Sequence, residues 1–140
     1  MSLLAIPRVY ALRGGPAWID TRLRYGLTGV CAGSAGVHAA LIQPHLAESA
    51  LLGSAFAAAA AALVLAALLV RQPRHDSWAI AAATVMLCVI GVSYLLSRST
   101  GIPLLIIQPE QADPLGTVTT AAELAGAMCG AALISRRDTK

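Results

Sequence analysis

Four long runs of apolar residues constrain the fold of this chain more than any other feature of its sequence. They cover residues 25–42, 46–70, 78–96 and 115–134. Each run approaches or exceeds the ~20 residues that an α-helix needs to cross the hydrocarbon core of a bilayer. None alternates polar and apolar residues as a strand of a membrane β-barrel does. Because backbone polar groups find no water inside a bilayer, these runs predict an all-α bundle of four transmembrane helices.

The composition agrees with a membrane protein made of one domain. Only 12% of the 140 residues are charged and 57% are hydrophobic, whereas roughly a quarter of the residues of a soluble domain are charged. We expect a cytoplasmic segment at residues 1–24, a transmembrane domain at residues 25–134 and a cytoplasmic tail at residues 135–140. Within the first segment, residues 3–13 are expected to form a helix on the membrane surface, with Trp18 as an interfacial anchor.

The first apolar run follows basic residues, as the apolar region of a secretory signal peptide does. It is longer than the usual ~7–15 residues, and no clean cleavage site of small residues follows it. We therefore expect a permanent membrane span at this position.

The distribution of charge predicts the orientation of the spans. Four arginines and one aspartate precede the first run, two arginines and one aspartate lie within residues 71–77, and three basic residues and one aspartate lie within residues 136–140. The other two connections hold Arg98 with three acids, Glu48, Glu110 and Asp113. Cytoplasmic loops of membrane proteins carry an excess of Lys and Arg. With four spans, all three basic segments fall on one side, which predicts that both termini are cytoplasmic.

Prolines and polar residues mark the connections between the runs. Residues 43–45, Gln-Pro-His, predict a tight turn, with Pro44 free to begin the second helix. In the loop at residues 71–77, Asp76 or Ser77 is suited to cap the third helix. The longer connection from Arg98 to Pro114 contains the apolar patch 102–107, which is too short to span a bilayer and is expected at its surface.

Two of these connections resemble each other. Residues 42–48, IQPHLAE, and residues 107–113, IQPEQAD, share four of seven positions and both end on an acid. A duplication of one helical hairpin would place both copies before an even-numbered helix, as observed, and would give two tandem hairpins. Independent use of Gln-Pro as turn chemistry explains the likeness equally well, since the second connection is longer.

Small residues recur at helical spacing in the first and fourth runs. Lipid offers no hydrophobic force between helices, so close approach at small residues drives their packing. We expect these glycines to pack helices within the bundle or against another subunit. They are Gly26, Gly29, Gly33 and Gly36 in the first run and Gly126 and Gly130 in the fourth.

Ionisable residues inside the apolar runs are the candidates for function, because such residues are costly in a membrane. Glu123 is the deepest, at roughly 12 Å from the outer end of its helix at 1.5 Å per residue. Under the predicted topology every helix contributes a polar group to the outer half of the bundle. The candidates for binding a ligand or ion are His38, His45, Glu48, Arg98 and Glu123.

Three interpretations of this outer cluster stay open. In the first, His38, His45, Glu48 and Glu123 bind a divalent transition metal, since imidazoles with carboxylates suit Zn, Cu, Mn or Fe. In the second, Glu123 pairs with Arg98 and His38 in a purely structural network, because an unpaired buried charge is unfavourable. In the third, the cluster receives a proton, a cation or a small polar ligand from outside.

Several classes of function lack support in the sequence. It contains no G-x-S-x-G, Walker A, H-E-x-x-H or G-x-G-x-x-G motif. The three cysteines, Cys31, Cys88 and Cys129, lie in apolar runs without a Cys-x-x-Cys pair, so we expect buried thiols. The sparse basic residues flank the apolar runs, which is typical of membrane topology and not of nucleic-acid binding.

The polar motifs resemble those of small four-helix membrane proteins of high-GC bacteria without an assigned activity. The likeness rests on Val37-His38, on Pro44 to Glu48 followed by Gly53, on residues 97–103 and on Glu123. It implies a multi-pass protein of the bacterial cytoplasmic membrane. Our leading hypothesis is a non-enzymatic module that binds an ion or a partner and associates with itself or a larger membrane complex. A metal-dependent redox or hydrolytic enzyme and a minimal proton- or cation-coupled transporter are the alternatives.

Overall fold

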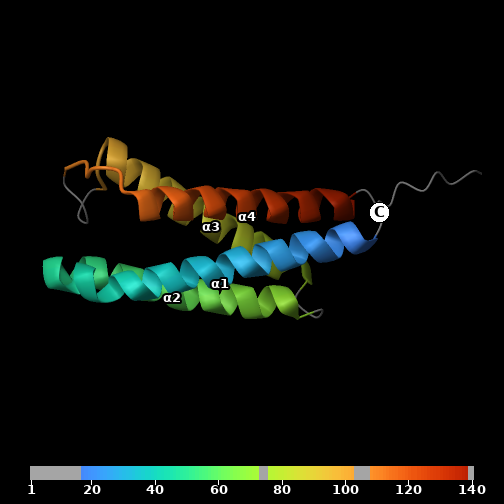
Figure 1. Ribbon diagram of the computed structural model, residues 1–140. Helices are drawn as coiled ribbons and strands as arrows, with labels where there is room; N and C mark the ends of the chain where they lie inside the picture. The colour runs from blue at the N-terminus through green and yellow to red at the C-terminus, as the bar shows by residue number, and fades with distance from the viewer. Residues whose placement is uncertain (1–16, 73–75, 103–107, 139–140) are drawn as a thin grey trace, which may run out of the picture.

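The computed structural model describes residues 17–72, 76–102 and 108–138, which fold into four helices (Figure 1). They are α1 (Ala17–Glu48), α2 (Ala50–Arg71), α3 (Asp76–Ser99) and α4 (Pro114–Asp138). All four are long and apolar enough to cross a membrane. The prediction of an all-α chain with four membrane-length helices is therefore confirmed.

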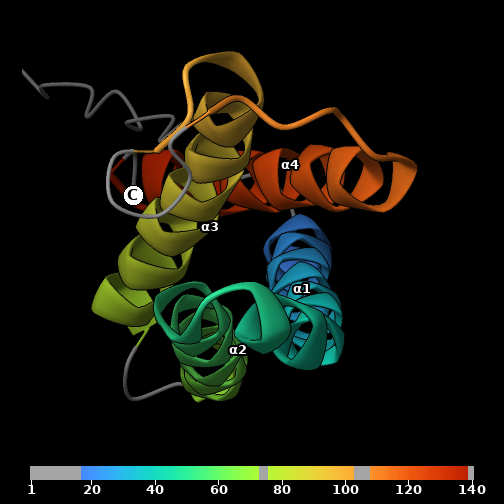
Figure 2. The same cartoon turned by 90° about the vertical axis from the view of Figure 1, so that its left-hand side faces the viewer.

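The helices form a bundle in which α1 contacts α2 and α4, while α3 contacts α4 and α2. Within the described part of the chain, α2 and α4 do not touch, so they lie at opposite corners. Figure 2 looks along α1 and α2 and shows α3 and α4 running across this pair at an inclination. The inclination brings the helices together in one half of the bundle and separates them in the other.

One end of the bundle, which we call the basic end, gathers the start of α1, the end of α2, the start of α3 and the end of α4. Arginine side chains connect these four helix ends. One of these arginines, Arg24, donates to a carbonyl in the last turn of α2, where the carbonyls lack donors within the helix. The opposite end, with the end of α1, the start of α2, the end of α3 and the start of α4, is the acidic end. The contacts at the basic end are Arg24 Nη1 to Val70 O at 2.9 Å, Arg136 Nε to Asp20 Oδ1 at 2.6 Å and Arg137 Nη1 to Ser77 Oγ at 3.1 Å.

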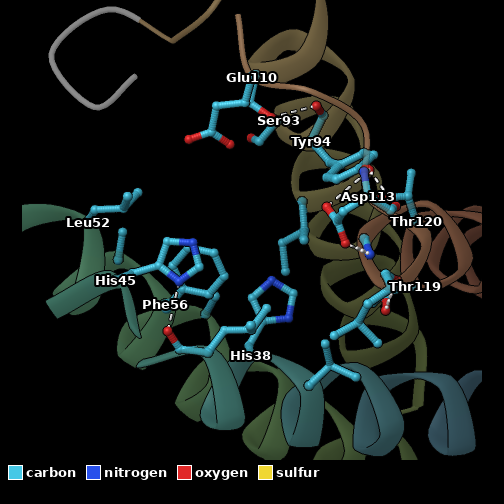
Figure 3. Close-up of a pocket in the computed structure, with 18 of the residues that line it drawn as sticks. His38, His45, Leu52, Phe56, Ser93, Tyr94, Glu110, Asp113, Thr119 and Thr120 are labelled. Carbon is cyan, nitrogen blue, oxygen red and sulfur yellow. Dashed lines mark hydrogen bonds between the residues drawn. The ribbon is translucent and has the colours of Figure 1, made fainter. Parts of the chain in front are cut away.

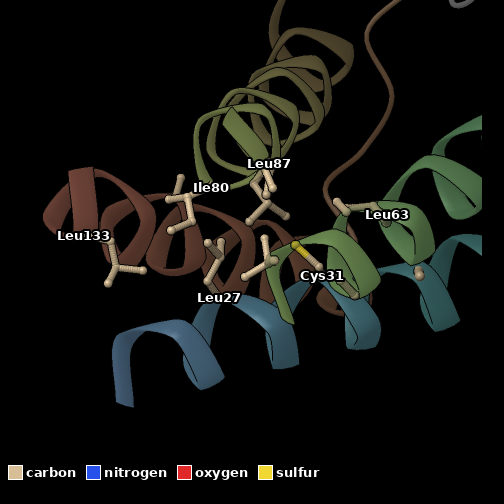
Figure 4. Packing of buried hydrophobic residues seen from close by; sticks show 13 residues of the cluster. Leu27, Cys31, Leu63, Ile80, Leu87 and Leu133 are labelled. Atoms are coloured by element: carbon tan, nitrogen blue, oxygen red, sulfur yellow. The ribbon is translucent and has the colours of Figure 1, made fainter. Parts of the chain in front are cut away.

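The apolar core fills the half of the bundle nearest the basic end (Figure 4). Large side chains from all four helices meet there, and alanines between them let the backbones approach closely. Its larger members are Leu27 and Cys31 of α1, Leu63 and Val70 of α2, Ile80 and Leu87 of α3, and Leu133 of α4.

The connection between α1 and α2 differs from the prediction of a turn at residues 43–45. Helix α1 continues through Pro44 and ends at Glu48, and the chain breaks at Ser49, whose hydroxyl accepts a hydrogen bond from Leu52 N at 3.4 Å. Proline disrupts the hydrogen bonds of the preceding turn. The carbonyl that loses its helical donor at Pro44 is that of Ala40, four residues before the proline. In the next position, the His45 ring nitrogen Nδ1 donates to the carbonyl of Leu41 at 2.8 Å.

Gly53 makes the reversal into α2 possible. A Cβ atom at this position would lie only 2.8 Å from the Cα atom of Leu46 in the last turn of α1. No other residue fits so close to that backbone.

The outer limits of the helices also differ from the predicted spans. Helix α1 begins at Ala17, inside the segment expected to be cytoplasmic, because a helix can continue past the bilayer once its apolar stretch ends. Helix α4 begins at Pro114, in agreement with a proline at the first helical position. The predicted surface helix at residues 3–13 and most of the apolar patch 102–107 lie outside the described residues.

The glycines divide into two groups. A Cβ atom at Gly126 would lie 2.7 Å from Val30 Cγ1, and one at Gly130 would overlap the hydroxyl of Thr84, so both glycines allow close helix packing in the bundle. In the first run, Gly26 lies beside Cys129, with 3.7 Å between an added Cβ and the sulfur. Among the described residues nothing lies within 4 Å of a Cβ at Gly29, Gly33 or Gly36. These three form an open face of α1.

Candidate functional site

A cavity of about 420 Å³ opens between the α1–α2 pair and the α3–α4 pair, in the half of the bundle nearest the acidic end (Figure 3). It occupies the region where the inclined helices separate, beyond the apolar core. Every helix and the connection before α4 contribute polar or aromatic groups to its wall. These include His38, His45, Phe56, Ser93, Tyr94, Ser97, Arg98, Glu110, Asp113, Thr119, Thr120 and Glu123.

Glu123 of α4 lies at the deep end of this cavity and is only 1% exposed. It follows Pro114 by nine residues, which places it roughly 13 Å along the helix at 1.5 Å per residue. Ser34 of α1, itself 5% exposed, donates its hydroxyl to Glu123 Oε1 at 2.5 Å. The Ser34 hydroxyl thus provides the carboxyl group with a hydrogen bond across the interface between α1 and α4.

His38 continues this chain of contacts toward the cavity. Its Nδ1 atom lies 2.9 Å from the carbonyl oxygen of Ser34 and 3.3 Å from the Ser34 hydroxyl. Because a carbonyl only accepts hydrogen bonds, Nδ1 must carry the proton, and Nε2 of the neutral ring is then an acceptor. His38, Ser34 and Glu123 therefore form one continuous line of polar groups.

His45 has the same arrangement two turns further along α1. Its Nδ1 atom donates to the Leu41 carbonyl at 2.8 Å, which again leaves Nε2 as an acceptor. The ring of Phe56 from α2 holds both imidazoles, with its centroid 4.0 Å from His45 in a stacked arrangement and 5.5 Å from His38 in a tilted one. Both histidines border the cavity with fixed ring positions (Figure 3).

Arg98 joins the end of α3 to the connection that precedes α4. It forms ion pairs with Glu110 and with Asp113, the latter at 2.9 Å between Nη2 and Oδ2. Its guanidinium carbon also lies 4.7 Å from the centre of the Tyr94 ring. The two carboxylates thus balance the positive charge of Arg98.

Asp113 also caps the first turn of α4. Its Oδ1 atom accepts a hydrogen bond from Gly116 N at 2.7 Å, which satisfies an amide that has no partner within the helix. This hydrogen bond lowers the pKa of Asp113 below its ordinary value of 3.8, and the charge of Arg98 also lowers it, against the opposing effect of partial burial. Asp113 is therefore ionised at neutral pH.

The cavity brings together four of the five predicted binding residues, namely His38, His45, Arg98 and Glu123. The fifth, Glu48, is exposed and does not line the cavity. Glu48 falls within the second predicted apolar run, residues 46–70, but it is the last residue of α1.

The geometry bears on two interpretations of the cluster, the metal site and the ion pair between Glu123 and Arg98. Within residues 17–72, 76–102 and 108–138, no group of three or more His, Cys, Asp or Glu side chains could hold a metal ion, so the four predicted metal ligands do not assemble. Over the same residues, the ion pairs of Arg98 are with Glu110 and Asp113 and not with Glu123. Glu123 instead accepts a hydrogen bond from Ser34, whose hydroxyl also lies 3.3 Å from His38 Nδ1.

Sequence reasoning overlooked Ser34, Phe56, Glu110 and Asp113 as parts of the site. Ser34 could have been found, because it lies four residues before His38 and hence on the same face of the helix. Phe56 carries no comparable signal, since an aromatic residue in an apolar helix ordinarily faces lipid or the core.

The charges of the cavity wall favour cations. Arg98 is offset by Glu110 and Asp113, and an ionised Glu123 brings the net charge of the wall to −2 when both histidines are neutral. A concave site lined by one sign of charge concentrates ions of the opposite sign.

No protein-family model, curated protein or solved structure matches this chain. Its function is therefore argued from the site alone.

Proposed function

We propose that this protein is a non-enzymatic, multi-pass module of the bacterial cytoplasmic membrane that binds a small cation in the cavity at its acidic end. The helices form two hairpins, both termini lie in the cytoplasm, and the cavity faces the exterior. The basic end supports this orientation, because it gathers Arg24, Arg71, Arg136 and Arg137, and cytoplasmic flanks of membrane proteins are rich in arginine.

The observation that carries the proposal is the burial of Glu123 at the deep end of a cavity. Among the described residues, this carboxyl group accepts a hydrogen bond from the Ser34 hydroxyl, and no Lys or Arg pairs with it. A carboxyl group so enclosed is stable as a neutral acid or with a cation beside it. The adjoining cavity offers a place for that cation.

The hydrogen-bonding groups of the wall define the class of ligand. The Nε2 atoms of His38 and His45 and the carboxylate of Glu123 all accept hydrogen bonds. A volume of about 420 Å³ exceeds that of a bare metal ion and lies in the range of small-molecule sites. An organic cation with N–H donors, such as a primary ammonium or a guanidinium, matches both features.

Binding of simple amines to the protein in lipid nanodiscs tests this proposal. The probes are guanidinium and primary alkylammonium ions from methyl to hexyl, and tetramethylammonium is the control that carries charge without an N–H donor. We expect the primary ions and guanidinium to shift the imidazole NMR signals of His38 and His45, and tetramethylammonium to bind more weakly. Glu123→Gln should abolish binding, whereas Glu48→Gln, which removes an exposed carboxylate at the same end, should retain it. Equal binding by Glu123→Gln, or no binding by any probe, contradicts the proposal.

A second candidate, cation-coupled transport, is favoured by the open glycine face of α1. A single four-helix unit offers little room for a complete path, and Gly29, Gly33 and Gly36 leave space for a second copy to approach closely. Uptake of the same amines into proteoliposomes, together with crosslinking in native membranes, tests this candidate. Uptake that is unchanged in Glu123→Gln, or a protein that is only monomeric, counts against it.

A further inference from the structure

A line of three polar side chains connects the cavity to its deepest carboxyl group. His38 borders the cavity, Ser34 lies between the two helices, and Glu123 is almost completely enclosed. The two links are 3.3 Å between His38 Nδ1 and Ser34 Oγ, and 2.5 Å between Ser34 Oγ and Glu123 Oε1. We propose that Glu123 exchanges protons with the cavity through Ser34 and His38.

The central position of this line suits a hydroxyl group. A serine hydroxyl donates one hydrogen bond and accepts others, so it can receive a proton from one side while it releases its own to the other. Ser34 is 5% exposed, and its hydroxyl contacts both neighbours of the line. Among small side chains, those of serine, threonine and cysteine combine a donor and an acceptor on one atom.

Each proton transfer balances without any further reactant. A hydronium ion in the cavity gives its proton to Nε2 of His38, which leaves a water molecule and makes an imidazolium. Nδ1 then passes its proton to Ser34 Oγ while the original Ser34 proton moves to Oε1 of Glu123. The carboxylate becomes a neutral acid, the hydroxyl is restored, and His38 is neutral with its proton on Nε2. Release of the proton follows the same steps in reverse.

The titratable and charged groups of the cavity wall determine the surroundings in which this proton exchange takes place. From α1 the titratable groups are His38 and His45, from α3 they are Tyr94 and Arg98, and from the connection before α4 they are Glu110 and Asp113. Helix α2 contributes only apolar side chains to the wall, namely Leu52, Ala55, Phe56 and Ala59. Arg98, the permanent positive charge of this set, is held by Glu110 and Asp113. The inference goes beyond cation binding, and it holds whichever ligand the cavity takes.

We call the line of His38, Ser34 and Glu123 the proton relay. Infrared spectroscopy of the full-length protein in nanodiscs tests the relay without any ligand. We expect a carbonyl band of a protonated carboxylic acid that disappears as the pH is raised, is absent from Glu123→Gln and is present in Glu48→Gln. After transfer to D₂O, the isotope shift of this band reports how fast the proton of Glu123 exchanges.

The matched variants distinguish proton exchange through Ser34 and His38 from direct exchange between Glu123 and water. Ser34→Ala and His38→Ala should slow the isotope exchange by about tenfold or more, in line with the loss of a positioned proton carrier. Ser34→Thr, which keeps the hydroxyl, should restore the rate, and added imidazole should accelerate exchange in His38→Ala. His45→Ala is the control, because His45 lines the same cavity but donates to Leu41 and not to Ser34.

Three results would overturn the inference. They are the absence of a titrating Glu123 band, exchange in Ser34→Ala as fast as in the native protein, and an equal effect of His38→Ala and His45→Ala. The second result would mean that cavity water reaches Glu123 directly. A failure of this test with retained amine binding leaves the proposed function standing, and the reverse outcome leaves the relay standing.

Discussion

The packing of α4 against α3 at Gly130 allows a quantitative test of the bundle. A methyl group added by Gly130→Ala would overlap the Thr84 hydroxyl and would lie 3.1 Å from Thr84 Cβ. Thr84 Oγ1 donates to the Ile80 carbonyl at 2.7 Å, so rotation of the side chain to avoid the clash gives up that hydrogen bond. The open position Gly33, where nothing lies within 4 Å of an added Cβ among the described residues, is the matched control.

The expected loss of stability follows from these contacts. Overpacking of a tight interface costs about 1–3 kcal/mol, and a side-chain hydrogen bond in a membrane protein contributes roughly 0.6 kcal/mol. Replacement of glycine by alanine inside a helix returns about 1 kcal/mol. Both Gly130→Ala and Gly33→Ala gain that last contribution, so it cancels between them. We expect Gly130→Ala to be about 2–3 kcal/mol less stable than Gly33→Ala.

Reversible unfolding by SDS in mixed micelles, followed by circular dichroism, measures this difference. The protein is kept dilute enough to be monomeric, so that the open glycine face does not contribute. Thr84→Ala removes the overlapping hydroxyl and should recover about 2 kcal/mol in the Gly130→Ala background, a coupling that a double-mutant cycle isolates. Equal stability of Gly130→Ala and Gly33→Ala, or no recovery by Thr84→Ala, would refute the packing described for α3 and α4.

Three further predictions concern the ends of the bundle. Asp113→Ala should lower the free energy of unfolding by about 1 kcal/mol through loss of the cap, whereas Asp113→Asn should retain most of it. Because the Gly116 hydrogen bond and then the charge of Arg98 hold the pKa of folded Asp113 below 3.8, its charge stabilises the fold above that pH. The difference between native protein and Asp113→Asn should vanish as the pH falls through the lowered pKa, and a difference that does not change over a pH series of unfolding curves would contradict this. Asp20→Asn should cost less than about 1 kcal/mol, as expected for a partly exposed ion pair, and exchanging the charges of Asp20 and Arg136 should recover part of it in the same assay. A green fluorescent protein fused after residue 140 should fluoresce in the cytoplasm, and an active alkaline phosphatase fusion there would overturn the orientation.

The sequence alone predicts the four membrane-length helices, because the energetic cost of exposing backbone polar groups to lipid leaves few alternatives. It also indicates that His38 and Glu123 lie in the same half of the bundle, since chain position and helix rise set depth. Neither conclusion needs knowledge of which helices touch.

The details that the sequence did not predict depend on tertiary contacts. A proline usually marks a helix boundary, but α1 continues through Pro44 and the break lies at Ser49, where Gly53 of α2 packs against Leu46 of α1. Depth alone could not reveal that Arg98 faces Glu110 and Asp113, since the rotation of a helix about its axis decides which partner a side chain meets.

The division of the bundle into a packed half and a hollow half explains how a buried acid is tolerated. In the half nearest the basic end, Leu27, Leu63 and Leu87 pack together in the apolar core. Toward the acidic end, the helices separate just beyond Ser34 and Glu123, so the carboxyl group lies at the border between dry core and cavity. A carboxyl group deeper in the core would have no route for a proton or a cation, and one nearer the cavity mouth would be permanently ionised and solvated. At this border the carboxyl group is both buried and adjacent to the cavity, which is why the proposed functions centre on Glu123.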